Sequence, residues 1–187
     1  MSLFFLGYRL PPAFEQYRQK VRSRLLNELG IHPEGGRTEA HVTVKHPVEL
    51  LDNHGSKIPG RIANMLVTKG IKSLRARIRP PSSFPGGVVY LPVECTELSA
   101  MMLYIIRNLG FEATELEGQN PHITLARIRA KDAKCDEHTC LAEGYAREID
   151  LPAREIELNT LVWWKKTTRG NEPIGEVNLN YSGLVTT

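Results

Sequence analysis

A short pattern, His-x-Thr-x, occurs twice in the chain, at residues 41–44 (HVTV) and at residues 122–125 (HITL). Successive side chains of a β-strand point to opposite faces, so the His and Thr of each copy share one face and the apolar residues share the other. Each copy therefore predicts a strand with an apolar back and a chemically active front. Two such fronts facing each other would place two imidazoles and two hydroxyls around one cleft, which suits acid–base chemistry on a phosphate ester. The alternative is two unrelated strand histidines with polar neighbours.

The chain has 187 residues, of which 41% are hydrophobic and 24% are charged. These values are ordinary for a globular protein with a substantial core. We expect one domain over residues 1–187, either simple or built from two similar lobes. The apolar run at residues 3–6 meets Arg9 and Pro11 too soon for a membrane span and lacks a basic leader and a cleavage site. It predicts the first strand of a cytoplasmic protein with no membrane segment.

Three cysteines without a secretory leader indicate reduced thiols rather than a disulfide framework. Cys135, His138 and Cys140 lie close together in the sequence and could be imagined as zinc ligands. However, no fourth ligand and no second Cys pair at zinc-finger spacing accompany them. We therefore predict no metal site and no cofactor.

The formal net charge of +3 is mildly basic. This charge is compatible with an anionic substrate but falls far short of a dedicated nucleic-acid-binding surface. Arg75, Arg77 and Arg79 alternate with apolar residues, so one strand would carry three guanidinium groups on one face. This face could follow a phosphodiester backbone, or it could simply be a solvated strand face.

Strand and helix patterns alternate along the chain, and the second half roughly repeats the first. Pro12 and Gly30 bound the first helix, and Thr96 is a possible cap of the third. Predicted strands cover residues 3–9, 39–45, 74–79, 88–94, 122–128, 156–164 and 174–181. Predicted helices cover residues 12–29, 59–70, 96–110 and 131–143, and loops or turns cover 53–55, 80–87 and 169–172. The pattern favours an α+β domain with helices packed on a mostly antiparallel sheet.

The two motifs resemble those of the two-histidine (2H) phosphoesterases, in particular the LigT-like branch of RNA 2′,3′-cyclic phosphodiesterases and 2′-5′ RNA ligases. Residues 121–127 (PHITLAR) are similar to the second motif of that branch, and Phe84-Pro85 with residues 88–91 (VVYL) is similar to its central hairpin. The resemblance covers nearly the whole chain. It implies a bilobal α+β fold, with two pseudo-symmetric antiparallel-sheet lobes, helices packed outside, a central cleft and no metal.

The resemblance also implies roles for individual residues. His41 and His122 match the catalytic histidines, and Thr43 and Thr124 match the hydroxyls that hold phosphate oxygens. Arg127 matches an arginine that touches phosphate, although strict alternation from His122 puts it on the opposite face unless the strand bulges or twists.

Other residues are expected on or near the cleft. Lys45 shares the face of His41 under strict alternation and is a further phosphate-binding expectation, whereas His46 is expected on the other face. For base stacking we consider Phe84, Tyr90 and Trp163, although aromatic residues on strands more often pack in a core. Residues 45–47 (KHP) depart from the Phe-Leu-Gly-like continuation usual in the family, and Ile174 stands where a tyrosine is common. These departures leave the substrate subgroup open.

The resemblance implies a monomeric, metal-independent enzyme that hydrolyses 2′,3′-cyclic phosphate ends of RNA or nucleotides to 2′-phosphates. By analogy, His122 would activate water and His41 would protonate the leaving 3′ oxygen. Alternatives with the same residues are a 2′-5′ RNA ligase, a 2′-5′ oligoadenylate phosphodiesterase and an ADP-ribose cyclic phosphate hydrolase. From a different class, the chain could be a non-catalytic nucleotide- or RNA-binding module.

Overall fold

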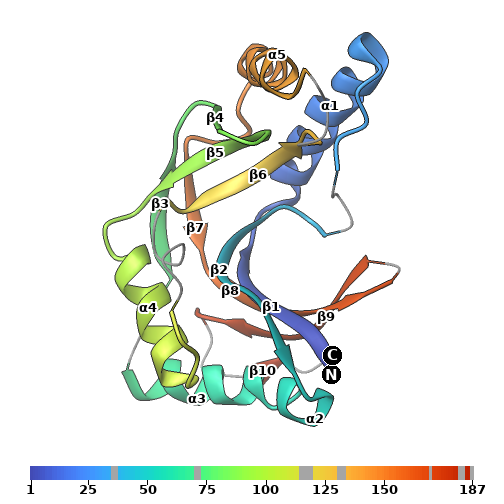
Figure 1. The fold of residues 1–187 in the computed structure, drawn as a ribbon. Coiled ribbons are helices and arrows are strands. Elements are labelled where there is room, and N and C mark those ends of the chain that lie inside the picture. The colour runs from blue at the N-terminus through green and yellow to red at the C-terminus, as the bar shows by residue number, and fades with distance from the viewer. Residues whose placement is uncertain are drawn as a thin grey trace.

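The computed structural model of the chain describes residues 1–34, 38–69, 73–113, 120–129, 134–168, 170–180 and 184–185. The strands are β1 (Ser2–Arg9), β2 (His41–Leu50), β3 (Leu74–Ile78), β4 (Ser82–Phe84), β5 (Val88–Glu94), β6 (His122–Arg127), β7 (Glu155–Leu158), β8 (Thr160–Thr167), β9 (Gly170–Asn178) and β10 (Leu184–Val185). The helices are α1 (Pro12–Leu29), α2 (Asp52–Gly55), α3 (Ile58–Lys69), α4 (Leu98–Asn108) and α5 (Cys135–Glu148). The predicted α+β class is confirmed (Figure 1).

The strands form one curled antiparallel sheet in the order β10-β9-β8-β1-β2-β6-β5-β3-β7, with β4 paired to β5. We call β1, β2 and β8–β10 the first lobe, and β3–β7 the second lobe. The lobes meet where Val42 of β2 pairs with Ile123 of β6. Reading outward from this junction, β2-β1-β8-β9 on one side corresponds to β6-β5-β3-β7 on the other. The predicted pseudo-symmetry of two antiparallel lobes is therefore confirmed.

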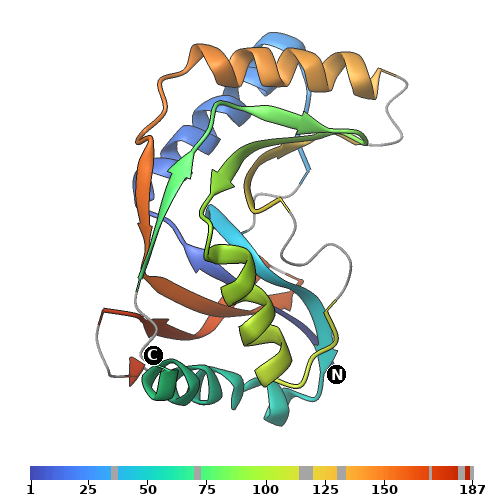
Figure 2. The ribbon, with the colours of Figure 1, turned by 90° about the vertical axis from the view of Figure 1, so that its left-hand side faces the viewer.

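The helices cross between the lobes. Helix α1 follows β1 of the first lobe in sequence but packs on β6 of the second, and α4 follows β5 of the second lobe but packs on β2 of the first. Helix α5 covers β4 and β5, whereas α3 covers β8 and β9. Figures 1 and 2 show α1 and α5 together at one end of the molecule, with α2, α3 and α4 at the other. Each lobe is thus covered in part by a helix from the other half of the chain.

Helix α1 begins and ends at the predicted residues. Pro12 occupies its first turn, where a missing N–H costs nothing. Gly30 follows its last residue with φ of 65° and donates to the carbonyl of Leu26 over 3.0 Å, and the Ile31 N–H reaches the carbonyl of Leu25. The left-handed conformation that this closure needs is one that glycine adopts without a steric penalty.

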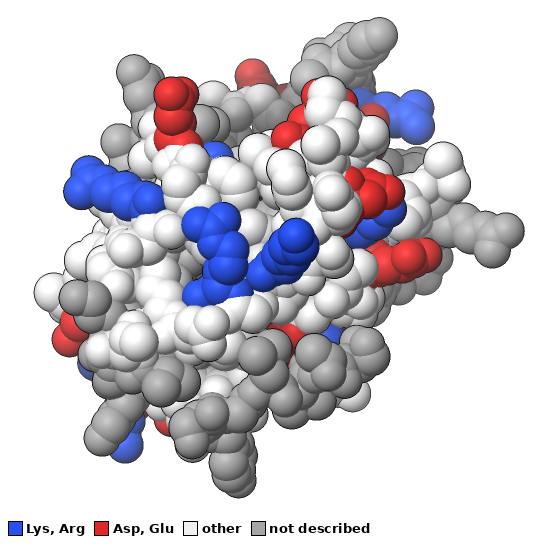
Figure 3. Space-filling model, turned by 90° about the horizontal axis from the view of Figure 1, so that it is seen from below, with Lys and Arg blue, Asp and Glu red and all other residues white. Residues whose placement is uncertain are grey.

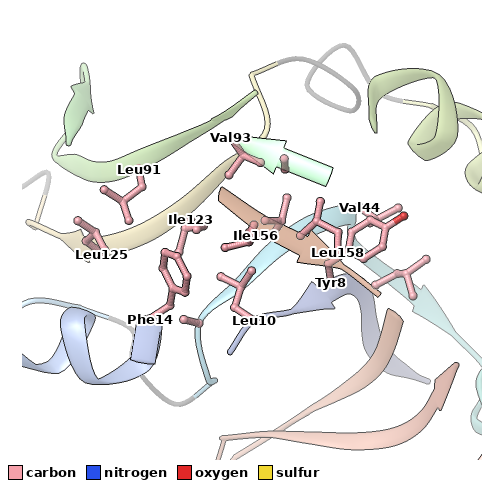
Figure 4. Close-up of a cluster of buried hydrophobic side chains, with 14 of the residues drawn as sticks. Tyr8, Leu10, Phe14, Val44, Leu91, Val93, Ile123, Leu125, Ile156 and Leu158 are labelled. Atoms are coloured by element: carbon pink, nitrogen blue, oxygen red, sulfur yellow. The ribbon is translucent and has the colours of Figure 1, made fainter. Parts of the chain in front are cut away.

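The apolar backs of the two motif strands lie in the main core. Val42, Val44, Ile123 and Leu125 are each 0 or 1% exposed. Figure 4 shows how side chains of β1, β2, β5, β6, β7 and the first turn of α1 meet there. Burial of one such side chain contributes about 1.5–3 kcal/mol, so this core fixes which face of each motif strand turns away from it.

Three local predictions are wrong. Residues 53–55, predicted as a loop, belong to the short helix α2, in which Gly55 packs so closely on Phe4 that a Cβ would lie 2.5 Å from its ring. Thr96 does not cap α4: the N-cap is Glu97, and a turn bond from the Leu98 N–H to the carbonyl of Cys95 precedes the helix. The expected connection at 80–87 includes strand β4, which folds back on β5.

The strand expected at residues 156–164 is in fact two strands. It breaks at Asn159, so that β7 pairs with β3 of the second lobe and β8 pairs with β1 of the first. Strand β2 also runs five residues beyond its predicted end, and α5 ends at Glu148 rather than Glu143. The predicted start of α5 and the end of the last predicted strand at Tyr181 lie outside the described residues.

The arginine face on β3 is largely matched by acidic neighbours. Arg77 lies 4.0 Å from Glu155, and Arg79 forms a 3.3 Å ion pair with Glu94. The register also places Arg75 opposite a glutamate of β7. This arrangement favours the reading of a solvated strand face over that of a phosphate-binding track.

Candidate active site

A cleft of about 800 Å³ lies between the lobes, and both motifs form part of its wall. His41, Thr43, His122 and Thr124 all line it, so the fold brings the four motif side chains together. The other lining residues are Phe5, Arg18, Arg22, Glu34, Thr38, Glu39, Ala40, His46, Pro47, Phe84, Val88, Asn120, Leu125, Arg127, Lys166 and Asn171.

The junction between β2 and β6 sets this arrangement. Val42 and Ile123 face each other across it, and both are completely buried. Since side chains alternate along a strand, the His and Thr residues on either side of this pair turn toward the cleft. The strands are antiparallel, so His41 lies toward Thr124 and Thr43 lies toward His122. The two motifs consequently present a His and a Thr from each side of a shared space.

Both imidazoles are held by the same backbone interaction. His41 Nδ1 lies 2.8 Å from the carbonyl oxygen of Glu39, and His122 Nδ1 lies 2.9 Å from that of Asn120. A carbonyl can only accept, so each Nδ1 carries the hydrogen. In the neutral ring, Nε2 then has the lone pair and can accept a proton, and in the charged ring it can donate one. Asn120 adopts a φ of 44°, which asparagine tolerates better than most residues.

A stacked aromatic pair packs against each imidazole. Phe5 and Trp164, whose centroids are 4.9 Å apart, lie 5.4 and 5.3 Å from the ring of His41. Phe84 and Tyr90 stack on each other and lie 5.2 and 5.3 Å from the ring of His122. These contacts restrict the rotation of each imidazole, which favours a fixed direction for proton transfer.

The aromatic residues considered for base stacking are placed differently from one another. Phe84 lines the cleft, whereas Tyr90 packs behind it and is absent from the cleft wall. The expectation for Trp163 is wrong, because its ring is 1% exposed and stacks in the core between Phe4 and Phe111. Alternation along β8 turns the neighbouring Trp164 toward His41 instead.

Burial lowers the pKa of both histidines below its usual value, because it disfavours the charged ring. For His41 the carbonyl of Glu39 partly opposes this shift, while the positive charges of Arg18 and His122 add to it. For His122 the carbonyl of Asn120 opposes it, while Arg127 and His46 add to it. Both rings therefore lose their proton more readily than a histidine exposed to water.

A β-bulge follows the second motif. Thr124 pairs with Tyr90 and Ala126 pairs with Val89, so one extra residue, Leu125, is accommodated in β6. Leu125 and Ala126 are therefore both buried, and Arg127 turns to the cleft. From the sequence, Arg127 could reach the cleft only if the strand bulged or twisted after the motif. The structure contains this bulge.

A matching bulge follows the first motif and overturns the expected face of Lys45. Thr43 pairs with Gly7, but Lys45 pairs with the adjacent Leu6. Lys45 is consequently 6% exposed, points away from the cleft and donates to the carbonyl of Glu112 over 3.4 Å. His46, expected on the other face, lines the cleft instead.

Helix α1 contributes two arginines to the cleft wall that periodicity does not reveal. Arg18 donates to the carbonyl of Thr38 over 2.6 Å and pairs with Glu15, and Arg22 donates to the carbonyl of Pro33 over 2.8 Å. These contacts tie the segment that precedes His41 to α1. In the sequence, these arginines form only part of the polar stripe of a helix. They lie near the motifs because α1 packs on the second lobe.

Gly7 lies directly beneath His41. A Cβ at this position would lie 2.7 Å from the carbonyl oxygen of Val42, 3.2 Å from Trp164 Cζ3 and 3.3 Å from His41 Cδ2. We expect Gly7→Ala to destabilise the fold by about 1–3 kcal/mol, as overpacking usually does, and to displace the imidazole. Urea unfolding would measure the first effect, and kcat the second. Gly60→Ala, where a Cβ has nothing within 4 Å, is the matched control; equal behaviour of the two variants would contradict this account.

Among the residues that the structure describes, no three His, Cys, Asp or Glu side chains are grouped so that they could hold a metal ion. Within the same residues, no helix is long and apolar enough to cross a membrane. Figure 3 shows the end of the molecule that carries α2 and α3: basic side chains gather near its centre amid uncharged surface, with acidic ones toward the sides.

The fold is similar to several solved structures. Escherichia coli LigT in complex with NADP+ has a TM-score of 0.62 at 14% identity, covering 96% of this chain and 99% of LigT. TT0787 of Thermus thermophilus has a TM-score of 0.59 at 15% identity, covering 96% and 98%. Kluyveromyces marxianus Usb1 has a TM-score of 0.55 at 13% identity, covering 92% and 97%. No family model and no curated protein matches the sequence. The chain has the fold of the LigT-like 2H phosphoesterases.

Proposed function

We propose that this chain, which has the LigT-like 2H fold, is a metal-independent phosphodiesterase that hydrolyses 2′,3′-cyclic phosphate ends of RNA or nucleotides to 2′-phosphates. The observation that carries the proposal is that His41 and His122 have equivalent positions and equivalent hydrogen bonds. Both line one cleft, and both donate from Nδ1 to a backbone carbonyl, so that each Nε2 is left to exchange a proton with a substrate. An acid and a base on opposite sides of one phosphorus atom are what this hydrolysis requires.

In the proposed reaction, neutral His122 takes a proton from water as the water oxygen bonds to phosphorus. Protonated His41 gives its proton to the ribose 3′ oxygen as the bond between phosphorus and that oxygen breaks. Thr43 and Thr124 donate hydrogen bonds to the non-bridging oxygens, where negative charge gathers in the transition state. Arg127 adds positive charge beside His122. The division of the acid and base roles between the histidines follows the family resemblance.

Nucleotide binding by a related fold also supports the proposal. Structures of E. coli LigT have been solved with 3′-AMP and with ATP, in addition to NADP+. A cleft of about 800 Å³ lies within the range of small-molecule sites and could hold one or two nucleotides.

The test is a comparison of substrates in EDTA. We expect turnover of nucleoside 2′,3′-cyclic phosphates to the 2′-phosphate, identified by chromatography. Parallel reactions with 2′-5′ oligoadenylate, ADP-ribose cyclic phosphate and RNA ends suitable for 2′-5′ ligation separate the alternative activities. Tight binding without any product would identify a non-catalytic module instead. Activity that EDTA abolishes and added metal restores would overturn the mechanism.

The pH dependence follows from the lowered pKa values of His41 and His122. The base must be neutral, so activity falls as pH drops through the lower of the two pKa values. The acid must be protonated, so activity also falls as pH rises through the higher one. We expect kcat/KM to be bell-shaped, with its maximum on the acid side of about pH 6.5, the usual histidine value. A bound phosphate stabilises the charged ring, so the profile of kcat should lie at higher pH. A kcat/KM that still rises above about pH 8 would contradict this assignment.

A further inference from the structure

The bulges after the two motifs make His46 and Arg127 equivalent positions. Each lies five residues after the histidine of its motif, and in each lobe the two residues before it are buried in succession. The bulge then turns the next side chain to the cleft wall. Arg127 occupies this position in the second lobe and His46 occupies it in the first. The cleft therefore contains a third histidine that the proposed acid–base mechanism does not use.

We propose that His46 binds a second anionic group of the substrate: the 5′-phosphate of the nucleotide whose 2′,3′-cyclic phosphate lies between His41 and His122. This inference rests on the proposed function and specifies its substrate. The favoured substrate is then an oligonucleotide end, or a nucleotide that carries a 5′-phosphate, rather than a nucleoside 2′,3′-cyclic phosphate without one.

Position along the strand separates His46 from the site of the cyclic phosphate. His46 lies three residues beyond Thr43, and at about 3.3 Å per residue this amounts to about 10 Å along β2. Arg127 lies equally far beyond Thr124, and the bulge in each strand makes about 10 Å the upper value for both separations. We therefore expect the two residues to lie on opposite sides of the cyclic phosphate, where His46 suits a neighbouring phosphate group. His46 remains close enough to His122 for its positive charge to lower the pKa of that histidine.

The charged surroundings of His46 also favour an anion. Besides His41 and His122, the basic side chains on the cleft wall are those of Arg18 and Arg22 from α1, Arg127 from β6 and Lys166 from β8. The acidic side chains on the wall are Glu34 and Glu39, which form ion pairs with Arg129 and Arg9 respectively. A protonated His46 thus adds to a positive field.

The experiment compares adenosine 2′,3′-cyclic phosphate with its 5′-phosphorylated form, using wild type, His46→Gln and His46→Arg. Near pH 6, we expect His46→Gln to raise KM for the 5′-phosphorylated substrate about tenfold more than it raises KM for the other substrate, the effect of losing one charged hydrogen bond. His46→Arg restores the positive charge found at the equivalent Arg127. It should therefore keep the low KM of the wild type for the 5′-phosphorylated substrate. His54→Gln, an exposed substitution on α2, is the matched control.

The outcomes separate this inference from the proposed function. If wild type hydrolyses both substrates with equal KM, or if His46→Gln raises KM equally for both, His46 does not bind a 5′-phosphate. A His46→Arg variant whose KM for the 5′-phosphorylated substrate is as high as that of His46→Gln also overturns the inference. If wild type hydrolyses neither substrate, the proposed function itself fails.

Discussion

Replacement of His41 or His122 by alanine is expected to lower kcat for 2′,3′-cyclic nucleotides by about 10³-fold, because general acid or base catalysis typically contributes about 10²–10⁴-fold. In the proposed mechanism, the two residues make two proton transfers in one displacement, on opposite sides of the phosphorus. The double variant should therefore be little slower than either single variant. Steady-state kinetics on purified protein in EDTA measures both effects.

Alanine also leaves space beside the stacked pairs Phe5–Trp164 and Phe84–Tyr90, and so could loosen the fold. The variants His41→Asn and His122→Asn fill part of this space, retain a polar side chain and cannot take the proton. They should unfold at nearly the wild-type urea concentration and still lose activity. His54→Ala, on the exposed surface of α2, serves as the control for histidine loss. Wild-type turnover by either alanine variant would exclude the mechanism.

Replacement of Thr43 or Thr124 by valine is expected to lower kcat by about 10²-fold, the usual effect of losing one donor to a developing oxyanion. Valine has nearly the same shape as threonine, and both threonines are only partly buried, so the loss reports mainly on the hydroxyl. Serine keeps the hydroxyl and should retain activity within a few-fold. The measurement is kcat for valine and serine variants at both positions.

The pseudo-symmetry of the site sharpens this comparison. Each threonine lies two residues after its histidine and faces the cleft beside the histidine of the other motif. Similar losses at the two positions are expected if the phosphate lies between the motifs. A large effect at one threonine and none at the other would place the phosphate against one lobe and contradict the symmetric arrangement.

Local patterns predicted much of the fold and the position of the paired motifs. The alternation in HVTV and HITL correctly indicated two strands with buried apolar backs, since Val42 and Ile123 are completely buried. The boundaries of α1 followed from a proline and a glycine whose conformational preferences act within one turn. Such signals are readable in sequence because their physical cause lies in neighbouring residues.

Predictions that extended strict alternation past the motifs failed for one physical reason. A bulge inserts one residue into a strand and reverses the faces that follow, so Lys45 went to the protein interior and His46 to the cleft. The same shift placed Arg127 on the cleft wall. Nothing in residues 41–50 marks the position of the bulge, because it depends on pairing with β1.

Contacts between distant segments could also not be predicted from local sequence patterns. The break at Asn159 divides one apolar run between two lobes, and only the pairing of β7 with β3 and of β8 with β1 reveals it. Likewise, Gly7 and Trp164 adjoin His41 through neighbouring strands rather than through sequence. The sequence contains these residues without indicating that they lie against His41.

The exchange of α1 and α4 between the lobes has a mechanical consequence. A hinge motion of one lobe relative to the other would have to separate α1 from β6 or α4 from β2. In addition, the Tyr17 hydroxyl of α1 donates a hydrogen bond of about 2.5 Å to the carbonyl of Ala146 in α5. The two lobes are therefore held together by helices that each pack on the opposite lobe. If the proposed reaction takes place in this cleft, we expect the substrate to enter through movements of side chains at its edge, with little change in the spacing of the two imidazoles.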